Sequence, residues 1–290
     1  MMVSADRGLT GKELKAMLIA GCLIVIFCVI FFVYLLAIWP RTSHMDEVMR
    51  YNGVLFAHRG FHNKDKYIPE NSMSAFRAAV EHGYGIELDI HITRDGRLAV
   101  FHDDTMERMC GIAGKVENHT FAELQKYHLL NTTERIPELT EVLSYVDGRV
   151  PLLIELKMSE QNFAVCEASY RLLKTYKGGY MIQSFNTMGL YWYRMHAPEV
   201  LRGQLSSDLT RSKEEAPYIL RFLVRYLLLN IIGKPDFISY KLKDLPNISV
   251  SLCRRLFGTP VAVWTLRTDQ ALREGKEHYN MCIFEKKGRA

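Results

Sequence analysis

An uncharged apolar segment near the N-terminus restricts what this chain can be. The twenty-four residues from 16 to 39, AMLIAGCLIVIFCVIFFVYLLAIW, contain no charged side chain. A bilayer core about 30 Å thick needs about 20 helical residues, so this segment is long enough to cross it. It is too long for the apolar region of a signal peptide, and no small-residue cleavage site follows it. The sequence therefore predicts a transmembrane anchor over 16–39, with a short tail at 1–15 and a polar linker at 40–50.

Charges on either side of the anchor predict its orientation. Arg7, Lys12 and Lys15 precede it, whereas Arg41 and Arg50 follow it. Because positive side chains favour the cytoplasmic side, the N-terminus is expected inside the cell and the large domain outside. We therefore expect a single-pass protein of the cell membrane with an extracytoplasmic domain.

The composition of the whole chain fits a globular domain, expected over residues 51–290. Of its 290 residues, 48% are hydrophobic and 24% are charged, and the formal net charge is +5. No Lys/Arg run and no interleaving of aromatic with basic residues stands out, so nucleic acid is not an expected partner. The mild positive charge suits an anionic substrate or an anionic membrane surface. The six cysteines form no Cys-x-x-Cys pair, so neither a zinc site nor a redox motif is indicated.

Short apolar runs alternate with segments of helical pattern through this domain. Such alternation predicts a parallel sheet, and eight units favour closure into a TIM-type (β/α)8 barrel. The Asp95-Gly96 turn in TRDGRLAVFHDD predicts a hairpin in which Leu98–Phe101 runs antiparallel to the second strand. Residues 104–137 lack an obvious strand and are expected to form a small insertion after that strand. The eight expected strands are Val54–Ala57, Ile86–Ile90, Leu152–Leu156, Tyr180–Gln183, Leu201–Leu205, Asp236–Ser239, Val261–Thr265 and Met281–Phe284.

Helical patterns fill most of the gaps between these strands. Examples are Ser72–His82, which Asn71 is expected to cap, and Ser159–Lys174. The segment Pro217–Pro235, PYILRFLVRYLLLNIIGKP, is unusually apolar for an outer barrel helix, and two arginines four residues apart share one of its faces. It is either a barrel helix that buries its inner face or an amphipathic helix on the bilayer, with its arginines near anionic headgroups. A second span is not expected, because each charge at mid-bilayer costs about 3 kcal/mol.

In the stretch VLFAHRGFHNKDKYIPENS, polar residues begin where an apolar strand ends. His58 and Arg59 directly follow the expected first strand, and Gly60 permits a sharp turn. Active sites of parallel barrels are built at the carboxyl ends of the strands. His102 ends the return strand of the hairpin, so two histidines are expected near one barrel mouth, where they can act as base and acid on a phosphodiester. Arg59 and Lys157 carry the charge needed to hold phosphoryl oxygens.

Two apolar strands also carry carboxylates. Glu87 and Asp89 in GIELDIH are two residues apart, so a side-chain period of two points both to one face. Glu155 and Lys157 in LLIELKM repeat this spacing. Because buried carboxylates must be paired or bind metal, three acids against one lysine predict a divalent cation. Oxygen ligands suit Mg²⁺ or Ca²⁺, and the chain has no His-x-His of the kind that zinc hydrolases on barrels often use.

Taken together, these blocks resemble the glycerophosphodiester phosphodiesterase family, as a membrane-anchored, bacterial-type member. The stretches AHRGFHNKDKYIPENSMSAF, GIELDIHITRDGRLAVFHDDT, IPELTEVL, LLIELK, IQSF, LRGQL, PDFISY and AVWTL occur in the family's order. The resemblance implies an eight-stranded barrel and metal-dependent hydrolysis of glycerophosphodiesters to glycerol 3-phosphate and an alcohol. It assigns catalysis to His58 and His102, and metal binding to Glu87, Asp89 and Glu155. Lysophospholipase D-like or phospholipase-like cleavage of lipids such as lysolipids, or a non-catalytic membrane-anchored binding barrel, are the alternatives.

The same resemblance implies supporting and substrate-binding positions. Arg59 and Lys157 match the family's phosphate-side basic residues, and Glu70 of Pro-Glu-Asn would orient or assist the site. Gln183 and Trp264 match positions that line the pocket, although Trp264 would also suit simple core packing. The last strand, in MCIFEKKGRA, departs from the Thr-Asp or Thr-Asn-Pro often seen there, which concerns the packing of the final helix rather than the chemistry. The nucleophile is either water or the neighbouring glycerol hydroxyl, through a cyclic phosphate.

Overall fold

The computed structural model describes residues 10–158, 162–211 and 216–285. Within these ranges nine strands form one sheet in the order β1-β9-β8-β7-β6-β5-β4-β2-β3, and a further pairing of β1 with β2 closes it. Eight strands are parallel and make a TIM-type barrel, whereas β3 runs antiparallel to β2. The strands are β1 (Leu55–Ala57), β2 (Gly85–Ile92), β3 (Leu98–Val100), β4 (Leu152–Leu156), β5 (Tyr180–Ser184), β6 (Arg202–Ser206), β7 (Phe237–Lys241), β8 (Val261–Leu266) and β9 (Met281–Phe284).

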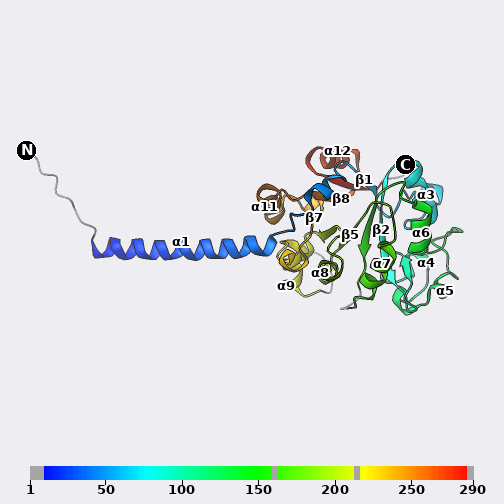
Figure 1. Ribbon diagram of the computed structural model, residues 1–290, viewed down its shortest axis with the longest axis horizontal. Coiled ribbons are helices and arrows are strands. Elements are labelled where there is room, and N and C mark those ends of the chain that lie inside the picture. Colours follow the sequence, from blue (N-terminus) through cyan, green and yellow to red (C-terminus); the bar gives the residue numbers. More distant parts are fainter. Residues whose placement is uncertain (1–9, 159–161, 212–215, 286–290) are drawn as a thin grey trace, which may run out of the picture.

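Helices form a ring around the barrel, and α1 leaves this ring between α9 and α11 (Figure 1). The described α-helices are α1 (Gly11–Ile38), α2 (Met45–Met49), α3 (Met73–Glu81), α4 (Glu107–Cys110), α5 (Phe121–Leu124), α6 (Leu139–Val146), α7 (Ala164–Leu173), α8 (Thr187–His196), α9 (Tyr218–Arg225), α10 (Asn230–Gly233), α11 (Ile248–Phe257) and α12 (Asp269–His278). Short 3₁₀ turns are η1 (Lys64–Lys66), η2 (Val116–Asn118), η3 (Leu209–Arg211) and η4 (Leu242–Asp244). The strand–helix alternation read from the sequence is therefore confirmed, including the hairpin between β2 and β3.

Two expectations about helices need correction. Ser72, rather than Asn71, caps α3, because the Ser72 hydroxyl accepts from the backbone N–H of Ala75 at 3.2 Å. The segment 217–235 is not one helix: α9 ends at Arg225, and the chain turns at Leu227, whose φ of 57° lies in the left-handed region. Leu227 is 1% exposed, so the chain turns there to fill the core before α10 begins.

Two further expectations concern the segments near α7 and α9. The expected helix Ser159–Lys174 begins in residues outside the described ranges, and α7 starts at Ala164. Arg225, which only the amphipathic alternative put near lipid headgroups, pairs with Asp208 at 2.9 Å and donates to the Thr210 hydroxyl at 2.7 Å. This arginine therefore ties α9 to the loop after β6.

The barrel interior has an apolar end and a polar end. Because side chains alternate along each strand, Phe237, Ser239 and Lys241 of β7 point to the same side, with the first at the amino end of the strand. Gly203 on neighbouring β6 lacks a side chain for a steric reason: a Cβ there would lie 2.2 Å from the Phe237 ring. The side chains that fill the amino end are Val48 of α2, Phe56, Leu153, Met181, Leu201, Phe237, Ala262, Met281 and Ile283.

The N-terminal helix α1 has two distinct parts. It is the one helix in the described ranges with the length and apolar composition of a membrane span or a signal sequence, and its apolar stretch is not buried in the protein. Its last turn, in contrast, packs into the barrel's outer layer: Ile38 is fully buried, and the Tyr34 hydroxyl lies 2.7 Å from that of Ser249 on α11. Trp39 stacks on Phe257 with ring centroids 5.3 Å apart.

Arg41 continues this attachment into the segment predicted as a linker. Its guanidinium makes two hydrogen bonds of 2.5 Å to the carboxylate of Asp236, and it also donates to the carbonyl oxygens of Pro198 and Val200. The Asp236 side chain is 1% exposed and precedes β7. Residues 40–50 therefore pack against the amino end of the barrel, through Arg41 and through α2.

Candidate active site

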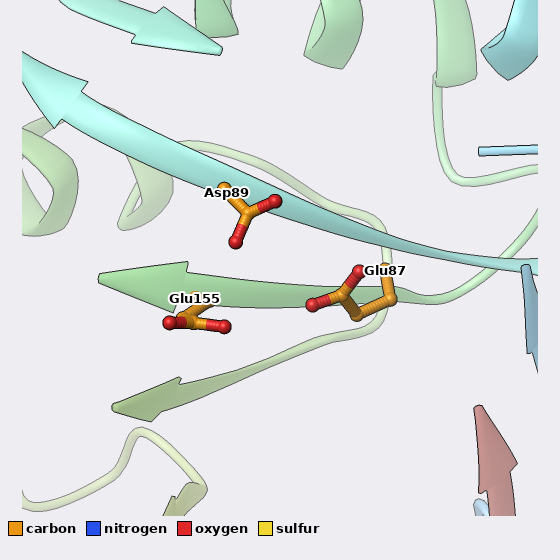
Figure 2. Close-up of side chains that lie close together, drawn as sticks. All are labelled: Glu87, Asp89 and Glu155. Atoms are coloured by element: carbon orange, nitrogen blue, oxygen red, sulfur yellow. The ribbon is translucent and has the colours of Figure 1, made fainter. Parts of the chain in front are cut away.

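Three carboxylates meet inside the barrel toward the carboxyl ends of β2 and β4. Glu87 and Asp89 lie on β2, and the register sets Asp89 opposite Glu155 of β4. One oxygen from each of the three lies within 4.8 Å of the others, and all three side chains are buried. Figure 2 shows the three side chains close together on the two strands. Such a set of oxygen donors fits a hard divalent cation.

The charges around this cluster are unevenly compensated. Burial, followed by repulsion from Asp89 and Glu155, raises the pKa of the Glu87 carboxyl well above its usual range. Burial also raises the pKa of Glu155, against the attraction of Lys157. Burial acts in the same direction on Asp89, but Lys157, His102 and Arg59 outweigh it and hold its pKa below the usual range. Full ionisation of the three acids is therefore disfavoured by the cluster's own surroundings, and a bound divalent cation would supply the missing positive charge.

Lys157 lies within this cluster of acids. Its Nζ is 2.5 Å from the Glu155 carboxylate and 3.0 Å from that of Asp89. Gln183 of β5 donates from its amide to the third acid, Glu87, at 3.3 Å. The predicted lysine and glutamine therefore contact the same carboxylates that the sequence suggested as metal ligands.

His58 is held by the C-terminal end of the described chain. Its Nδ1 lies 2.7 Å from Glu285 Oε1, and Arg267 binds the same carboxylate at 2.5 and 2.8 Å. Burial alone would raise the pKa of Glu285, but His58 and Arg267 hold it below its usual range. An ionised carboxylate only accepts, so Nδ1 carries the proton and Nε2, 4.0 Å from Glu87, is free to accept one.

His102 has the same kind of support from other residues. Its Nδ1 lies 2.7 Å from Asp103 Oδ1, and Arg108 donates from Nε to Asp103 Oδ2 at 2.6 Å. Burial opposes ionisation of Asp103, yet His102 and Arg108 hold its pKa below the usual range. Both predicted histidines thus bond through Nδ1 to a carboxylate that an arginine binds in turn.

Arg59, which follows the first strand, contacts both the acid cluster and Glu70. Its backbone N–H donates to Glu87 at 3.0 Å, and its guanidinium donates to Glu70 at 2.6 Å and lies 3.6 Å from Asp89. Burial would raise the pKa of Glu70, but ion pairs with Arg108 and Arg59 lower it to about 2. The φ of Arg59 is 55°, in a region that side chains rarely adopt, and Gly60 follows at 77°. A strained backbone of this kind is found preferentially at functional sites.

These groups open onto one cavity of about 320 Å³. Eight of the ten side chains singled out from the sequence line it: His58, Arg59, Glu87, His102, Glu155, Lys157, Gln183 and Trp264. Asp89 belongs to the acid cluster and Glu70 lies behind Arg59, so neither is a lining residue. The other lining residues are Phe185, Leu205, Lys241, Lys243, Thr265, Arg267 and Ile283.

Several residues that contact the predicted site side chains were not predicted from the sequence. Asp103 stands next to His102 in VFHDD, a signal that could have been read, whereas Arg108 is brought in by α4. Glu285 and Arg267 come from the end of the chain, where no local pattern links them to His58. Asn71, expected only as a helix cap, donates its side-chain amide to Asp89 at 2.9 Å.

Comparison with known proteins identifies relatives of this barrel. The glycerophosphodiester phosphodiesterase of Bacillus altitudinis is 40% identical over 111 residues, 36% of this chain and 44% of that protein. A lysophospholipase D of Rattus norvegicus is 30% identical over 157 residues, 50% of this chain and 48% of that protein. The chain thus spans about half the length of these curated relatives.

A solved structure shares the fold over most of both chains. It is a phosphodiesterase of Oleispira antarctica in complex with the product sn-glycerol-3-phosphate, with a TM-score of 0.66 and 21% identity over 81% of this chain and 94% of that one. The sequence profile described as "Glycerophosphoryl diester phosphodiesterase family" matches residues 58–288, which include all the strands of the barrel except β1. This chain therefore belongs to the glycerophosphoryl diester phosphodiesterase family.

Proposed function

We propose that this protein is a phosphodiesterase that hydrolyses glycerophosphodiesters to glycerol 3-phosphate and an alcohol with the help of a divalent cation. One observation carries the proposal: His58 and His102 open onto the cavity that holds the acidic cluster. Family membership supports the same reaction.

Glu87, Asp89 and Glu155 would hold the cation, either Mg²⁺ or Ca²⁺. The fit is supported by three buried carboxylates whose oxygens converge within 4.8 Å and whose negative charge Lys157 and Arg59 only partly offset. When bound, such a cation withdraws electron density from a phosphoryl oxygen and stabilises the charge that develops in the transition state.

The two histidines would transfer the protons. With Nδ1 bonded to Glu285, His58 presents Nε2 to the cavity, where it can take a proton from the attacking hydroxyl. His102, bonded to Asp103, would give a proton to the departing alcohol. The attacking group is water or the neighbouring glycerol hydroxyl, the latter through a cyclic phosphate.

Basic and aromatic side chains would bind the rest of the substrate. Arg59 and Lys157 would neutralise the phosphoryl oxygens, with Glu70 holding the Arg59 guanidinium in place. Gln183 and Trp264 would line the pocket for the glycerol or the leaving alcohol. A lysophospholipase D-like or phospholipase-like cleavage would use the same groups on a lysolipid or other membrane lipid, and the rat relative named for that activity supports this second candidate. A non-catalytic binding barrel is a weaker alternative, because it would not require this set of acids and histidines.

We also propose a membrane location and a division of the chain. Residues 16–39 would span the membrane once, after a tail at 1–15 of which residues 1–9 lie outside the described ranges. Residues 40–50 would connect the span to the barrel at 51–290, with an insertion at about 104–137. The excess of Lys and Arg before the proposed span supports an extracytoplasmic barrel.

The reaction is tested on the full chain in detergent micelles or nanodiscs, with phosphorus NMR to follow glycerophosphocholine and lysophosphatidylcholine in Mg²⁺, Ca²⁺ or chelator. His58→Ala and His102→Ala are each expected to lower kcat about a hundredfold or more, because a positioned acid or base is lost. His128→Ala, an exposed histidine of the insertion, is the matched control and should match wild type. Activity of both variants near wild type would refute the assignment.

The metal site has a readout that does not depend on activity. Glu87→Gln and Asp89→Asn should each weaken Mg²⁺ or Ca²⁺ binding at least tenfold in isothermal titration calorimetry, since each removes one charged oxygen ligand. Unchanged affinity in these variants would show that the cation binds elsewhere.

A further inference from the structure

The wall of the cavity that faces the acids contains two lysines. Lys241 is the last residue of β7, and the alternation from Phe237 through the buried Ser239 directs its side chain into the barrel mouth. Lys243 follows in η4 and lines the same cavity. In the strand register Lys241 lies opposite Trp264 of β8. Two cations and one indole therefore stand together across from the acidic cluster.

These cations differ from the other basic groups that line the cavity. Arg59, Lys157 and Arg267 each form an ion pair with a carboxylate of the site. Among the described residues, neither Lys241 nor Lys243 has a carboxylate within ion-pair distance or a hydrogen-bond partner for its ammonium group. The second wall is therefore electropositive, without internal compensation from the residues described.

An unsatisfied donor accompanies the two lysines. The Trp264 Nε1 atom is buried and has no hydrogen-bond partner in the described ranges. A buried N–H without an acceptor is costly, so an oxygen from a bound molecule would satisfy it. Together with the two ammonium groups it makes a set of donors suited to an anion, and the cavity lining also includes the apolar side chains of Phe185 and Leu205.

From this arrangement we propose that Lys241, Lys243 and Trp264 form a second anion subsite, which binds an anionic group on the leaving alcohol of the substrate. The proposal rests on the function proposed above and specifies its substrate class. The diester phosphate lies at the acids and Arg59, and a second phosphate or carboxylate lies at the lysines. The preferred substrates are therefore glycerophosphodiesters whose alcohol is itself negatively charged, such as a chain of glycerophosphate units or an anionic lipid headgroup.

A cationic alcohol is disfavoured by the same wall. The ammonium group of a choline ester would lie near two lysines that pair with no carboxylate of the described residues, and the resulting repulsion raises KM. A neutral alcohol would contact Trp264 and Leu205 but leave the lysines solvated. The three kinds of alcohol thus rank in the order anionic, neutral and cationic.

The test compares three soluble diesters on the full chain: glycerophosphoglycerol phosphate, glycerophosphoglycerol and glycerophosphocholine. The phosphate-bearing substrate is expected to have a kcat/KM about tenfold or more above that of the neutral one, mostly through a lower KM. In Lys241→Met and Lys243→Met this ratio should fall toward one, and Lys241→Arg should restore much of it. Lys276→Met, an exposed lysine of α12 outside the cavity, should keep the wild-type ratio.

The outcomes separate this subsite from the reaction itself. Turnover of all three diesters with equal efficiency, unaffected by the lysine variants, would overturn the subsite and leave the proposed reaction standing. Absence of turnover of any diester, lysolipids included, would overturn the proposed reaction. The second anion can come from a lipid headgroup or from a soluble glycerophosphate chain, and a lysolipid with a phosphate-bearing headgroup, presented in vesicles, separates the two. A preference that depends on the lysines for the lysolipid indicates the lipid source, and the same preference for the soluble diester indicates the glycerophosphate chain.

Discussion

At the scale of single residues, each histidine depends on a carboxylate that the other does not share. Glu285 fixes the proton on Nδ1 of His58, and Asp103 stands in the same relation to His102. An arginine binds each carboxylate, which keeps it ionised in a partly buried place. Such carboxylates set the tautomer of an imidazole and so decide which nitrogen is free to exchange a proton.

A second residue-scale feature is the buried ion pair between Arg41 and Asp236. Removing one partner of a buried pair leaves an uncompensated charge, which costs about 3 kcal/mol. Arg41→Ala should therefore lower the free energy of unfolding by about that amount, as seen in a lower Tm by tryptophan fluorescence in micelles. Arg50→Ala, an exposed arginine nine residues on, should leave Tm unchanged.

The double variant checks the cause of that loss. Adding Asp236→Asn to Arg41→Ala removes the stranded charge, so part of the lost stability should return. Equal Tm values for wild type and Arg41→Ala would mean that the pair adds nothing to the stability of the barrel.

At the scale of elements, α9 has one end fixed to the barrel and one end with an apolar surface that would suit contact with lipid. Its carboxyl end is fixed where β6 and β7 end, because Val224 and Arg225 offer their carbonyl oxygens to Ser206 and Tyr240. Its first turn, in contrast, exposes three large apolar side chains, Tyr218, Ile219 and Leu220. The helix lies beside the point where α1 leaves the ring, so a bilayer around α1 would also reach α9 (Figure 1).

A photo-crosslinking residue tests this contact in the full chain. Benzoylphenylalanine at position 219, in nanodiscs, should crosslink to lipid, since the apolar turn would insert at the interface. The same residue at exposed position 130, in the segment between α5 and α6, should not. Equal labelling at the two positions would contradict a lipid-facing α9.

The elements of the barrel were predictable to different degrees from the sequence. Strands such as Leu152–Leu156 were readable because each is a short apolar run followed by polar residues and a helical pattern. The break between α9 and α10 could not be predicted from the sequence, since both halves are apolar and the turn depends on how Leu227 packs. In the site, the shared face of Glu87 and Asp89 could be predicted because the two residues are two apart on one strand. The contact of Glu285 with His58 could not, because it depends on the pairing of β9 with β1 that closes the barrel.

At the scale of the whole molecule, the length of α1 would set how far the barrel stands from the membrane if α1 is the span proposed above. The eighteen residues 16–33, which precede the buried turn, extend about 27 Å at 1.5 Å per residue. That is close to the thickness of the hydrocarbon core, about 30 Å. With Tyr34 already held by α11, the barrel would rest directly against the headgroups.

The side of the membrane is open to a direct measurement. Proteinase K added to intact cells that produce the full chain should degrade the barrel, because the charges flanking the proposed span would place it outside. A cytoplasmic marker protein should survive in the same samples. A barrel that is digested only after the cells are lysed would reverse the orientation.

If α1 anchors the protein as proposed, its packed last turn has a consequence for release of the barrel by proteolysis. Ile38 is buried in the outer layer of the barrel, and Arg41 is the ion-pair partner of Asp236. A peptidase that cut between Tyr34 and Arg41 would therefore remove packing contacts from the domain. The freed fragment would lack a piece of its own core. Shedding a functional soluble form would therefore require a cut farther toward the N-terminus, within the proposed span.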